Sequence, residues 1–178
     1  MTILRTARLT LRPLTLDDLP AVVAWRNDPE IARFQGWDLP VTLENARGLI
    51  SDGPLGSPGW VQRAIVLQNG MLLVDVGLNT EGRQAEIGVT LRSHSQWRGY
   101  AAEALRGLIR HTFGDLHLHR LHASADPRNV RVVRLLTGLG FRHEGTSIQS
   151  YWQRGEWTDD ARFGLLASEW VMQLRSIR

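Results

Sequence analysis

The stretch from Gln96 to Phe113 constrains this chain most, because it places a helix directly after a strand and a glycine turn. Helical spacing within it is carried by Ala101, Leu105, Leu108, Ile109 and Thr112. Gly114 follows at the position of a C-terminal cap. Before the stretch, polar and apolar residues alternate over Ala85–Leu91 as they do in a strand. The first N–H groups of such a helix point outward without partners, and the helix dipole favours an anion there. We therefore predict a phosphate site at Gly99, with the charge of Arg98 at its mouth, while an ordinary turn remains the alternative.

Two motifs in this order resemble those of the GNAT N-acetyltransferase superfamily. Gln96–Ala101 reads Q-W-R-G-Y-A, similar to the Q/R-x-x-G-x-G/A signature whose loop holds the pyrophosphate of acyl-CoA. Asp126–Asn129 reads D-P-R-N, and Leu139–Phe141 reads L-G-F, like the second signature of that family. The resemblance runs from the Arg8–Pro13 region to Trp170 and is closest to the RimJ/RimL-like members, the ribosomal-protein N-terminal acetyltransferases.

Composition limits the function classes. A chain of 178 residues with 43% hydrophobic content is predicted to form one domain, residues 1–178, with a proper core. There is no cysteine, which excludes disulfides, a thiol nucleophile and Cys-zinc sites. All 21 basic residues are arginine, the net charge is only +3, and arginines alternate with acids, so no basic stripe predicts nucleic-acid binding. No apolar run reaches the ~20 residues that span a membrane, and the start lacks a signal-peptide core, so we expect a cytoplasmic protein.

The pattern of the chain predicts an α/β fold of the order β-α-α-β-β-β-α-β-α-β-β, which matches the GNAT fold, a mixed and largely antiparallel twisted sheet flanked by helices. Strands are expected at Arg8–Pro13, Trp60–Leu67, Met71–Asn79, Gln84–Leu91, Arg120–Ala125, Arg142–Tyr151 and Asp159–Ser168. Helices are expected from Thr15 to about Asn27, and at Glu30–Phe34, Thr42–Ser51, Tyr100–Phe113, Pro127–Leu139 and Trp170–Leu174.

Three local signals fix the ends of these elements. Asn69-Gly70 predicts a two-residue type I′ hairpin turn. Asp126 is expected to cap the helix that begins at Pro127, with Gly140 past its end. Gly155 is expected in the turn of the last hairpin.

The resemblance implies a set of residues that bind acetyl-CoA as the acyl donor. The pantetheine arm would lie along the Glu86–Leu91 strand as an added β-strand, using N–H groups that a bulge leaves free, and one donor at Val89 would face the thioester carbonyl. The implied CoA-binding residues are Val89, Thr90, Leu91, Gln96, Trp97, Arg98, Gly99, Tyr100, Ala101 and Asn129. An ordinary central strand, and a helix-start role for Asn129, are the structural alternatives.

Catalysis by direct transfer needs a base for the attacking amine and a proton for the leaving thiolate. Glu86 is the predicted base, with a structural carboxylate as the equal alternative. Many relatives carry a serine or tyrosine where this chain has Val132 and Leu136, so the usual proton donor does not carry over. Tyr151 is the predicted substitute.

Aromatic and histidine residues raise two further questions. Trp37, Trp152 and Trp157 fall in segments expected around the acceptor mouth, where aromatic faces suit an amine, and structural packing is the alternative. His117 and His119 are two residues apart and would face the same side of an extended segment, and His122 follows, but no carboxylate completes a metal site nearby, so no metal is expected.

The sequence therefore predicts an acetyl-CoA-dependent N-acetyltransferase that transfers directly to a primary amine, either a protein N-terminus or a small molecule. A CoA-binding sensor without strong catalysis, and a transferase for another short acyl-CoA such as succinyl-CoA, stay open. A nucleotide-binding module would need a Gly-Lys-Ser/Thr loop, which is absent. We expect no nucleic acid or membrane partner, and the pairing of two copies as a homodimer stays open.

Overall fold

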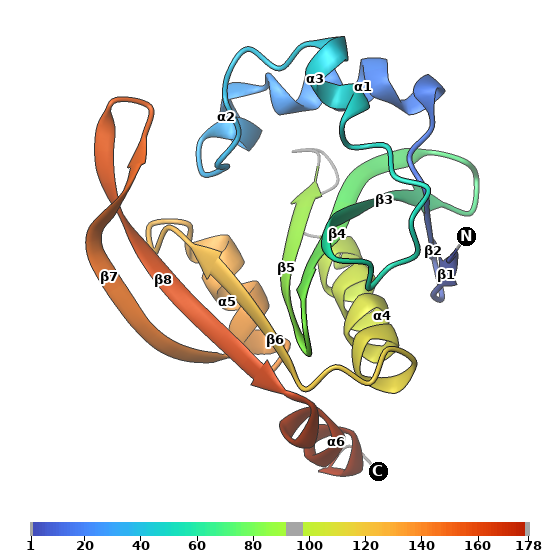
Figure 1. Cartoon of the computed structure of the whole chain (residues 1–178), viewed down its shortest axis with the longest axis vertical. Coiled ribbons are helices and arrows are strands. Elements are labelled where there is room, and N and C mark those ends of the chain that lie inside the picture. The colour runs from blue at the N-terminus through green and yellow to red at the C-terminus, as the bar shows by residue number, and fades with distance from the viewer. Residues whose placement is uncertain (1, 92–97, 177–178) are drawn as a thin grey trace.

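The computed structural model describes residues 2–91 and 98–176, and these form one mixed sheet with helices on both faces (Figure 1). Its strand order is β1-β2-β3-β4-β5-β6-β8-β7, and the pair β5–β6 is parallel while the other pairs are antiparallel. The strands are β1 (Leu4–Arg5), β2 (Leu9–Arg12), β3 (Gly59–Leu67), β4 (Leu72–Glu81), β5 (Gln84–Leu91), β6 (Arg120–Ala125), β7 (Arg142–Gln153) and β8 (Glu156–Leu166). The predicted fold class is confirmed, with β1 as a short addition that the sequence pattern did not indicate.

The helices are α1 (Leu19–Arg26), α2 (Pro29–Ala32), α3 (Leu43–Arg47), α4 (Tyr100–Gly114), α5 (Val130–Gly138) and α6 (Ala167–Ser176), and a 3₁₀ turn, Leu16–Asp18, precedes α1. Leu105 and Leu108 of α4 pack with Ile87 of β5 in the main core, which Leu136 of α5 completes. Val22 of α1 instead packs on Ala64 of β3, in a separate cluster.

Among the described residues no helix has the length and apolar character needed to cross a membrane.

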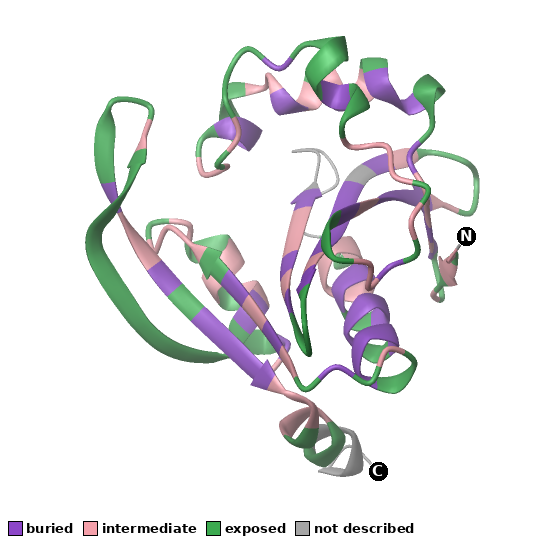
Figure 2. Cartoon of the chain, viewed as in Figure 1, coloured by how far each residue is buried: buried purple, intermediate pink, exposed green. Residues whose placement is uncertain are grey.

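Helix α4 buries the face that its periodicity predicts, whereas strand β7 is exposed along almost its whole length (Figure 2). Within the predicted stripe of α4, Leu105, Leu108, Ile109 and Thr112 are buried, while Ala101 is half-buried. Strand β7 lies at the edge of the sheet, and every residue in it except Gln153 is exposed. The edge strand therefore contributes little to the core, although it is the longest strand of the sheet.

The turn between β3 and β4 differs from the sequence prediction, whereas Gly155 lies in the turn of the last hairpin as predicted. Leu67 donates its N–H to the Met71 carbonyl, so three residues lie between this hydrogen-bonded pair, and of these only Gly70 has a positive φ, +85°. A type I′ turn would need positive φ at both central residues, so the predicted two-residue turn is wrong, and the geometry is that of a three-residue loop with glycine in the left-handed position. The type I′ pattern occurs instead between β7 and β8, where Arg154 and Gly155 have φ of +47° and +84°.

Three predicted helix ends are also corrected. The helix after Thr42 stops at Arg47, because the chain tightens to i→i+3 hydrogen bonds at Gly48, a poor helix former. Gly114 is the last residue of α4 rather than its cap. Asp126 does not cap α5. Asn129 does, by accepting the Val132 N–H, while residues 126–129 form a turn.

Gly140, by contrast, lies past the end of α5 as predicted. Its φ is +89°, and the Phe141 N–H reaches back to the Leu136 carbonyl, which closes the helix end.

Candidate active site between β5 and β6

A gap between β5 and β6 is the main irregularity of the sheet. Their parallel register covers only three pairs, from Gln84 with Arg120 to Glu86 with His122, although β5 continues to Leu91 and β6 to Ala125. The two strands lie side by side at their starts and diverge beyond this point (Figure 1). Within the described residues, the edge of β5 after Glu86 that faces β6 has no strand partner.

Every second residue of β5 directs its backbone N–H and C=O groups toward this gap. Glu81 of β4 and Gln84 of β5 are paired across a two-residue turn, so the backbone groups of Gln84 face β4. Alternation along the strand then directs those of Val89 and Leu91 to the opposite side, toward β6. The register between β4 and β5 runs without a shift, so the expected bulge is not found, and the free groups come from the divergence of β5 and β6.

The start of α4 lacks a capping side chain. The N-cap residues of helices α2, α3 and α5 are Asp28, Thr42 and Asn129, whose side chains accept a backbone N–H of the first turn. The N-cap of α4 is Gly99, in the left-handed conformation with φ of +74°, and glycine has no side chain to offer. The N–H groups at the start of the longest helix are therefore suited to an external anion. Arg98 is exposed beside them, whereas Gln96 and Trp97 lie outside the described residues.

Glu103 ties the N-terminal segment of the chain to the first turn of α4, a connection that the sequence analysis missed. Its Oε1 accepts the Thr6 hydroxyl at 2.6 Å and the Arg8 N–H at 2.7 Å, while its Oε2 accepts the Arg8 Nε at 2.6 Å. Burial would raise the pKa of Glu103, but these three hydrogen bonds outweigh it and hold the pKa below its ordinary value.

Arg8 in turn reaches the glycine turn. Its Nη1 donates to the Arg98 carbonyl at 3.0 Å, and its guanidinium lies 4.6 Å from the centre of the Tyr100 ring. This clamp, formed by Thr6, Arg8 and Glu103, holds the turn at Gly99 in place. It joins residues more than 90 positions apart, so no local pattern could have indicated it.

Glu86 is half-buried on β5, with Asn79 of β4 and His122 of β6 as its aligned neighbours. Side chains of aligned residues lie on the same face, so Glu86 and His122 are adjacent. None of the ion pairs among the described residues involves Glu86. Thr90, two pairs further along the same face, is buried opposite Asp75, which pairs with Arg26 of α1 at 2.7 Å.

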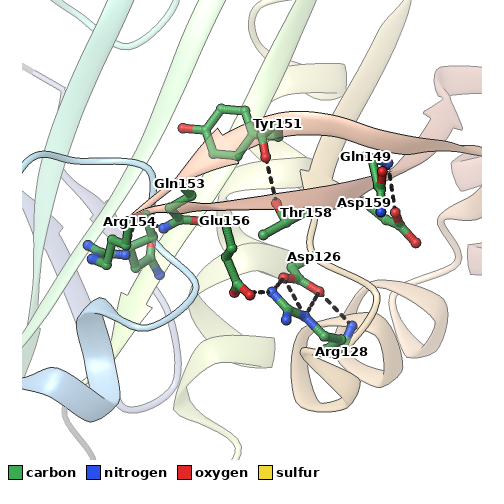
Figure 3. Close-up of polar contacts among 10 residues, drawn as sticks. Asp126, Arg128, Gln149, Tyr151, Gln153, Arg154, Glu156, Thr158 and Asp159 are labelled. Atoms are coloured by element: carbon green, nitrogen blue, oxygen red, sulfur yellow. Dashed lines mark hydrogen bonds and ion pairs between the residues drawn. The ribbon is translucent and has the colours of Figure 1, made fainter.

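Polar contacts join the turn between β6 and α5 to the β7–β8 hairpin (Figure 3). Asp126 accepts the Arg128 N–H at 2.8 Å and its Nη2 at 2.6 Å, and the same Nη2 contacts Glu156 of β8 at 2.9 Å. Burial acts to raise the pKa of Asp126, but the bonds from Arg128 and the nearby charge of Arg33 lower it below its ordinary value. Asp126 is therefore an acceptor held by arginine, and not a free base.

The two positions without a proton donor are occupied by packing residues. Leu136 is buried in the main core and Val132 packs against it. Their apolar character fits the interior of α5.

Tyr151 lies near the β7–β8 tip. Strand β7 continues past Tyr151 to Gln153, and a Cβ on Gly36 would meet the Tyr151 hydroxyl at 2.6 Å, so this hydroxyl lies against the α2–α3 loop. Gln153 Nε2 donates to the Gln35 carbonyl in the same loop. The loop and the hairpin tip therefore meet, and Tyr151 is part of this junction.

The three predicted tryptophans differ in their surroundings. Trp37 donates its indole N–H to the Arg26 carbonyl at 3.0 Å and stacks 4.3 Å from the Arg26 guanidinium, contacts that match the packing alternative. Trp152 and Trp157 are paired across the hairpin, with ring centres 5.3 Å apart, and both are more than half exposed. In the described ranges, no group of three or more histidine or acidic side chains is arranged to hold a metal ion.

A strand with a free backbone edge, next to a helix start without a capping side chain, suits an extended ligand that carries phosphate. Residues 8–142 match the family model of the acetyltransferase (GNAT) domain, and the chain belongs to this family. It is similar to the uncharacterized N-acetyltransferase p20 of Bacillus licheniformis, with 31% identity over 96% of this chain and 99% of the relative.

Solved structures support the fold. An acetyltransferase (GNAT family) from Bacillus anthracis superposes with a TM-score of 0.81 over 94% of this chain and 99% of that one, at 22% identity. The spermidine N-acetyltransferase of Vibrio cholerae, solved in complex with CoA and spermine, has a TM-score of 0.82 over 93% and 99% of the two chains, at 21% identity. The chain is thus an acetyl-CoA-dependent N-acetyltransferase by family.

Proposed function

We propose that the chain transfers an acetyl group from acetyl-CoA directly to a primary amine, and that the gap between β5 and β6 is the place of transfer. The observation that carries this proposal is the coincidence of the free β5 edge with the uncapped start of α4. The arm of acetyl-CoA would pair with the backbone at Val89 and Leu91, and its pyrophosphate would bind the N–H groups from Gly99 to Ala101. Gln96, Trp97, Arg98 and Asn129 complete the proposed CoA site.

The proposed reaction needs no covalent enzyme intermediate. The amine nitrogen attacks the thioester carbonyl carbon, and the Val89 N–H stabilises the developing oxyanion. Glu86 accepts a proton from the amine, directly or through water, as the C–N bond forms. The C–S bond then breaks, and the CoA thiolate takes its proton from Tyr151 or from water.

Glu86 has the properties of a base in this arrangement. It lies on β5 three residues before Val89, it is half-buried, and none of its described neighbours holds it in an ion pair. The Tyr151 hydroxyl lies against Gly36 at the junction with the hairpin tip, so water is the alternative proton source for the thiolate. A CoA-binding sensor remains the second candidate, and the apolar Val132 and Leu136 favour it, since they leave α5 without a proton donor.

The acceptor is proposed as a peptide N-terminus, in line with the RimJ/RimL-like motifs, or a small amine. Thiol release from acetyl-CoA across a panel of peptides, polyamines and amino acids tests this directly. The chain has no cysteine and no lysine, so every thiol detected comes from CoA, and self-acetylation is confined to the N-terminus. Release well above hydrolysis with one acceptor class, together with the mass shift of that acceptor, is expected. Tight CoA binding with no release across the panel would leave the sensor.

A further inference from the structure

Four side chains form one row across a face of the sheet, at the level where β5 and β6 begin to diverge. The strand registers align Trp60 of β3 with Asn79 of β4, Asn79 with Glu86 of β5, and Glu86 with His122 of β6. Aligned residues of neighbouring strands direct their side chains to the same face. Trp60 is about half exposed and the other three are half-buried, so water reaches the row.

The surroundings of Glu86 single out His122. On the β4 side, its neighbour is the amide of Asn79, which does not ionise. Further along β5, the Trp60 ring lies 3.5 Å from the position that a Cβ on Gly88 would take, so an apolar ring covers the next position on this face. Among the described residues next to Glu86 on this face, His122 is the one whose side chain ionises near neutral pH.

The other side of His122 is closed by charged groups that are already paired. The residue of β8 aligned with His122 is Gly164, and a Cβ there would collide with Arg120 Nη1 and Glu144 Oε1. The Arg120–Glu144 pair therefore lies over Gly164, beside His122. Hydrogen bonds from Arg120, and then from Arg142, outweigh burial and lower the pKa of Glu144 to about 2. Glu144 is therefore ionised at neutral pH and does not take a proton from His122.

His122 and Glu86 are adjacent, and both side chains are unengaged. Within the described chain neither has a hydrogen bond or an ion pair, with the other or with a third group. The nearest further charge on this face is Arg162, which is aligned with Ser124 and lies 3.4 Å from Asp160. A single water molecule can bridge two polar groups that lie beyond direct hydrogen-bonding distance.

We propose that His122 relays to solvent the proton that Glu86 takes from the amine. This inference rests on the proposed function, because it takes Glu86 as the base. As the C–N bond forms, an N–H proton of the amine passes to the Glu86 carboxylate. The carboxylic acid gives this proton, through a bridging water, to the neutral His122 imidazole, which restores the carboxylate for the next turnover.

The imidazolium then releases the proton to bulk water, and the positive charge of Arg120 beside it favours this release. The proton that the CoA thiolate takes up is a separate one. His122 thus acts through Glu86, as a positioning residue for the proton.

The test is the rescue of His122→Ala by free imidazole. Thiol release is measured with acetyl-CoA and the acceptor that gives the highest rate in the panel of peptides, polyamines and amino acids, after subtraction of the release without protein. We expect the kcat of His122→Ala to be about tenfold below that of the wild type, because water substitutes in part for the relay. Imidazole should restore most of this loss, whereas pyrazole, a ring of the same size and a much weaker base, should not. His119→Ala, at an exposed histidine one residue before β6, should keep the wild-type rate without rescue.

Coupling to Glu86 separates a relay from a structural role. In the Glu86→Gln background, His122→Ala should lower kcat by less than about twofold, and imidazole should not rescue it, because no proton reaches the relay. Thermal melts confirm folding, and His122→Gln, which keeps a polar side chain, should behave like His122→Ala.

Three results would overturn the relay and leave the proposed function in place. These are wild-type kcat in both His122 variants, equal rescue by imidazole and pyrazole, and a full tenfold loss in the Glu86→Gln background. A wild-type protein that releases no thiol with any acceptor contradicts the proposed function instead, and the relay with it.

Discussion

Replacing Gly99 with aspartate tests the anion site at the start of α4, because it adds a negative charge where the pyrophosphate is proposed to bind. A Cβ at this position would have the Arg8 Nη2 as its nearest neighbour, at 3.5 Å, which is an ordinary contact, so space is available. The left-handed φ of +74° costs most side chains about 1–2 kcal/mol, but asparagine and aspartate visit this region more readily. Gly99→Asn is therefore the matched control, with the same shape and no charge.

The expected size follows from the charge. Two unit charges about 6 Å apart at an effective dielectric constant near 20 repel each other by about 3 kcal/mol. Partial neutralisation by Arg8 and screening by salt lower this, so we expect Gly99→Asp to bind CoA about 2 kcal/mol more weakly than Gly99→Asn, about 30-fold in Kd. Calorimetry at two salt concentrations measures the CoA affinity of both variants, and thermal melts confirm that both are folded. Equal affinity of the two folded variants would refute the anion site.

Further predictions concern the base and the clamp. Glu86→Gln should lower kcat by roughly 10- to 1,000-fold, and kcat should recover toward pH 9, where the amine arrives neutral. Tyr151→Phe should lower kcat about tenfold, without recovery at high pH. Wild-type rates for Glu86→Gln at every pH would make Glu86 a structural residue. Glu103→Ala removes the acceptor of three hydrogen bonds and should lower the unfolding free energy by about 3 kcal/mol in urea titrations, against less than about 0.5 for the exposed Arg106→Ala on the same helix. Because the pKa of Glu103 is lowered in the folded protein, its contribution is complete above its unfolded pKa of about 4.3 and is lost as the pH falls below it, so the stability difference between wild type and Glu103→Gln should shrink in acid.

Much of the fold could be predicted from local patterns in the sequence. The alternation of residues 84–91 and 120–125 gave β5 and β6 with their observed bounds, and the period of α4 identified its buried face. Errors arose where two local signals competed. Asp126 and Asn129 are both good capping residues, and the structure uses Asn129 because Arg128 occupies the Asp126 carboxylate. Similarly, Asn-Gly suits a type I′ turn, yet a three-residue loop forms there.

Long-range contacts account for what the sequence could not indicate. The clamp of Glu103 on Thr6 and Arg8, the placement of His122 beside Glu86 and the meeting of Gln153 with Gln35 all join distant segments. The divergence of β5 and β6 was also invisible, because both strands have ordinary alternation up to their ends. The resemblance located the CoA loop, but the free edge of β5 is a property of the sheet and needed the structure.

A crystal structure with bound acetyl-CoA tests the central claim most directly. We expect pyrophosphate oxygens within about 2.7–3.2 Å of backbone nitrogens at the start of α4, the range of an N–H···O hydrogen bond. The arm should follow the β5 edge, with the thioester carbonyl facing the Val89 N–H and with Glu86 on the acceptor side. An acetyl-CoA molecule bound outside the gap between β5 and β6, or with its pyrophosphate away from Gly99, would contradict the account.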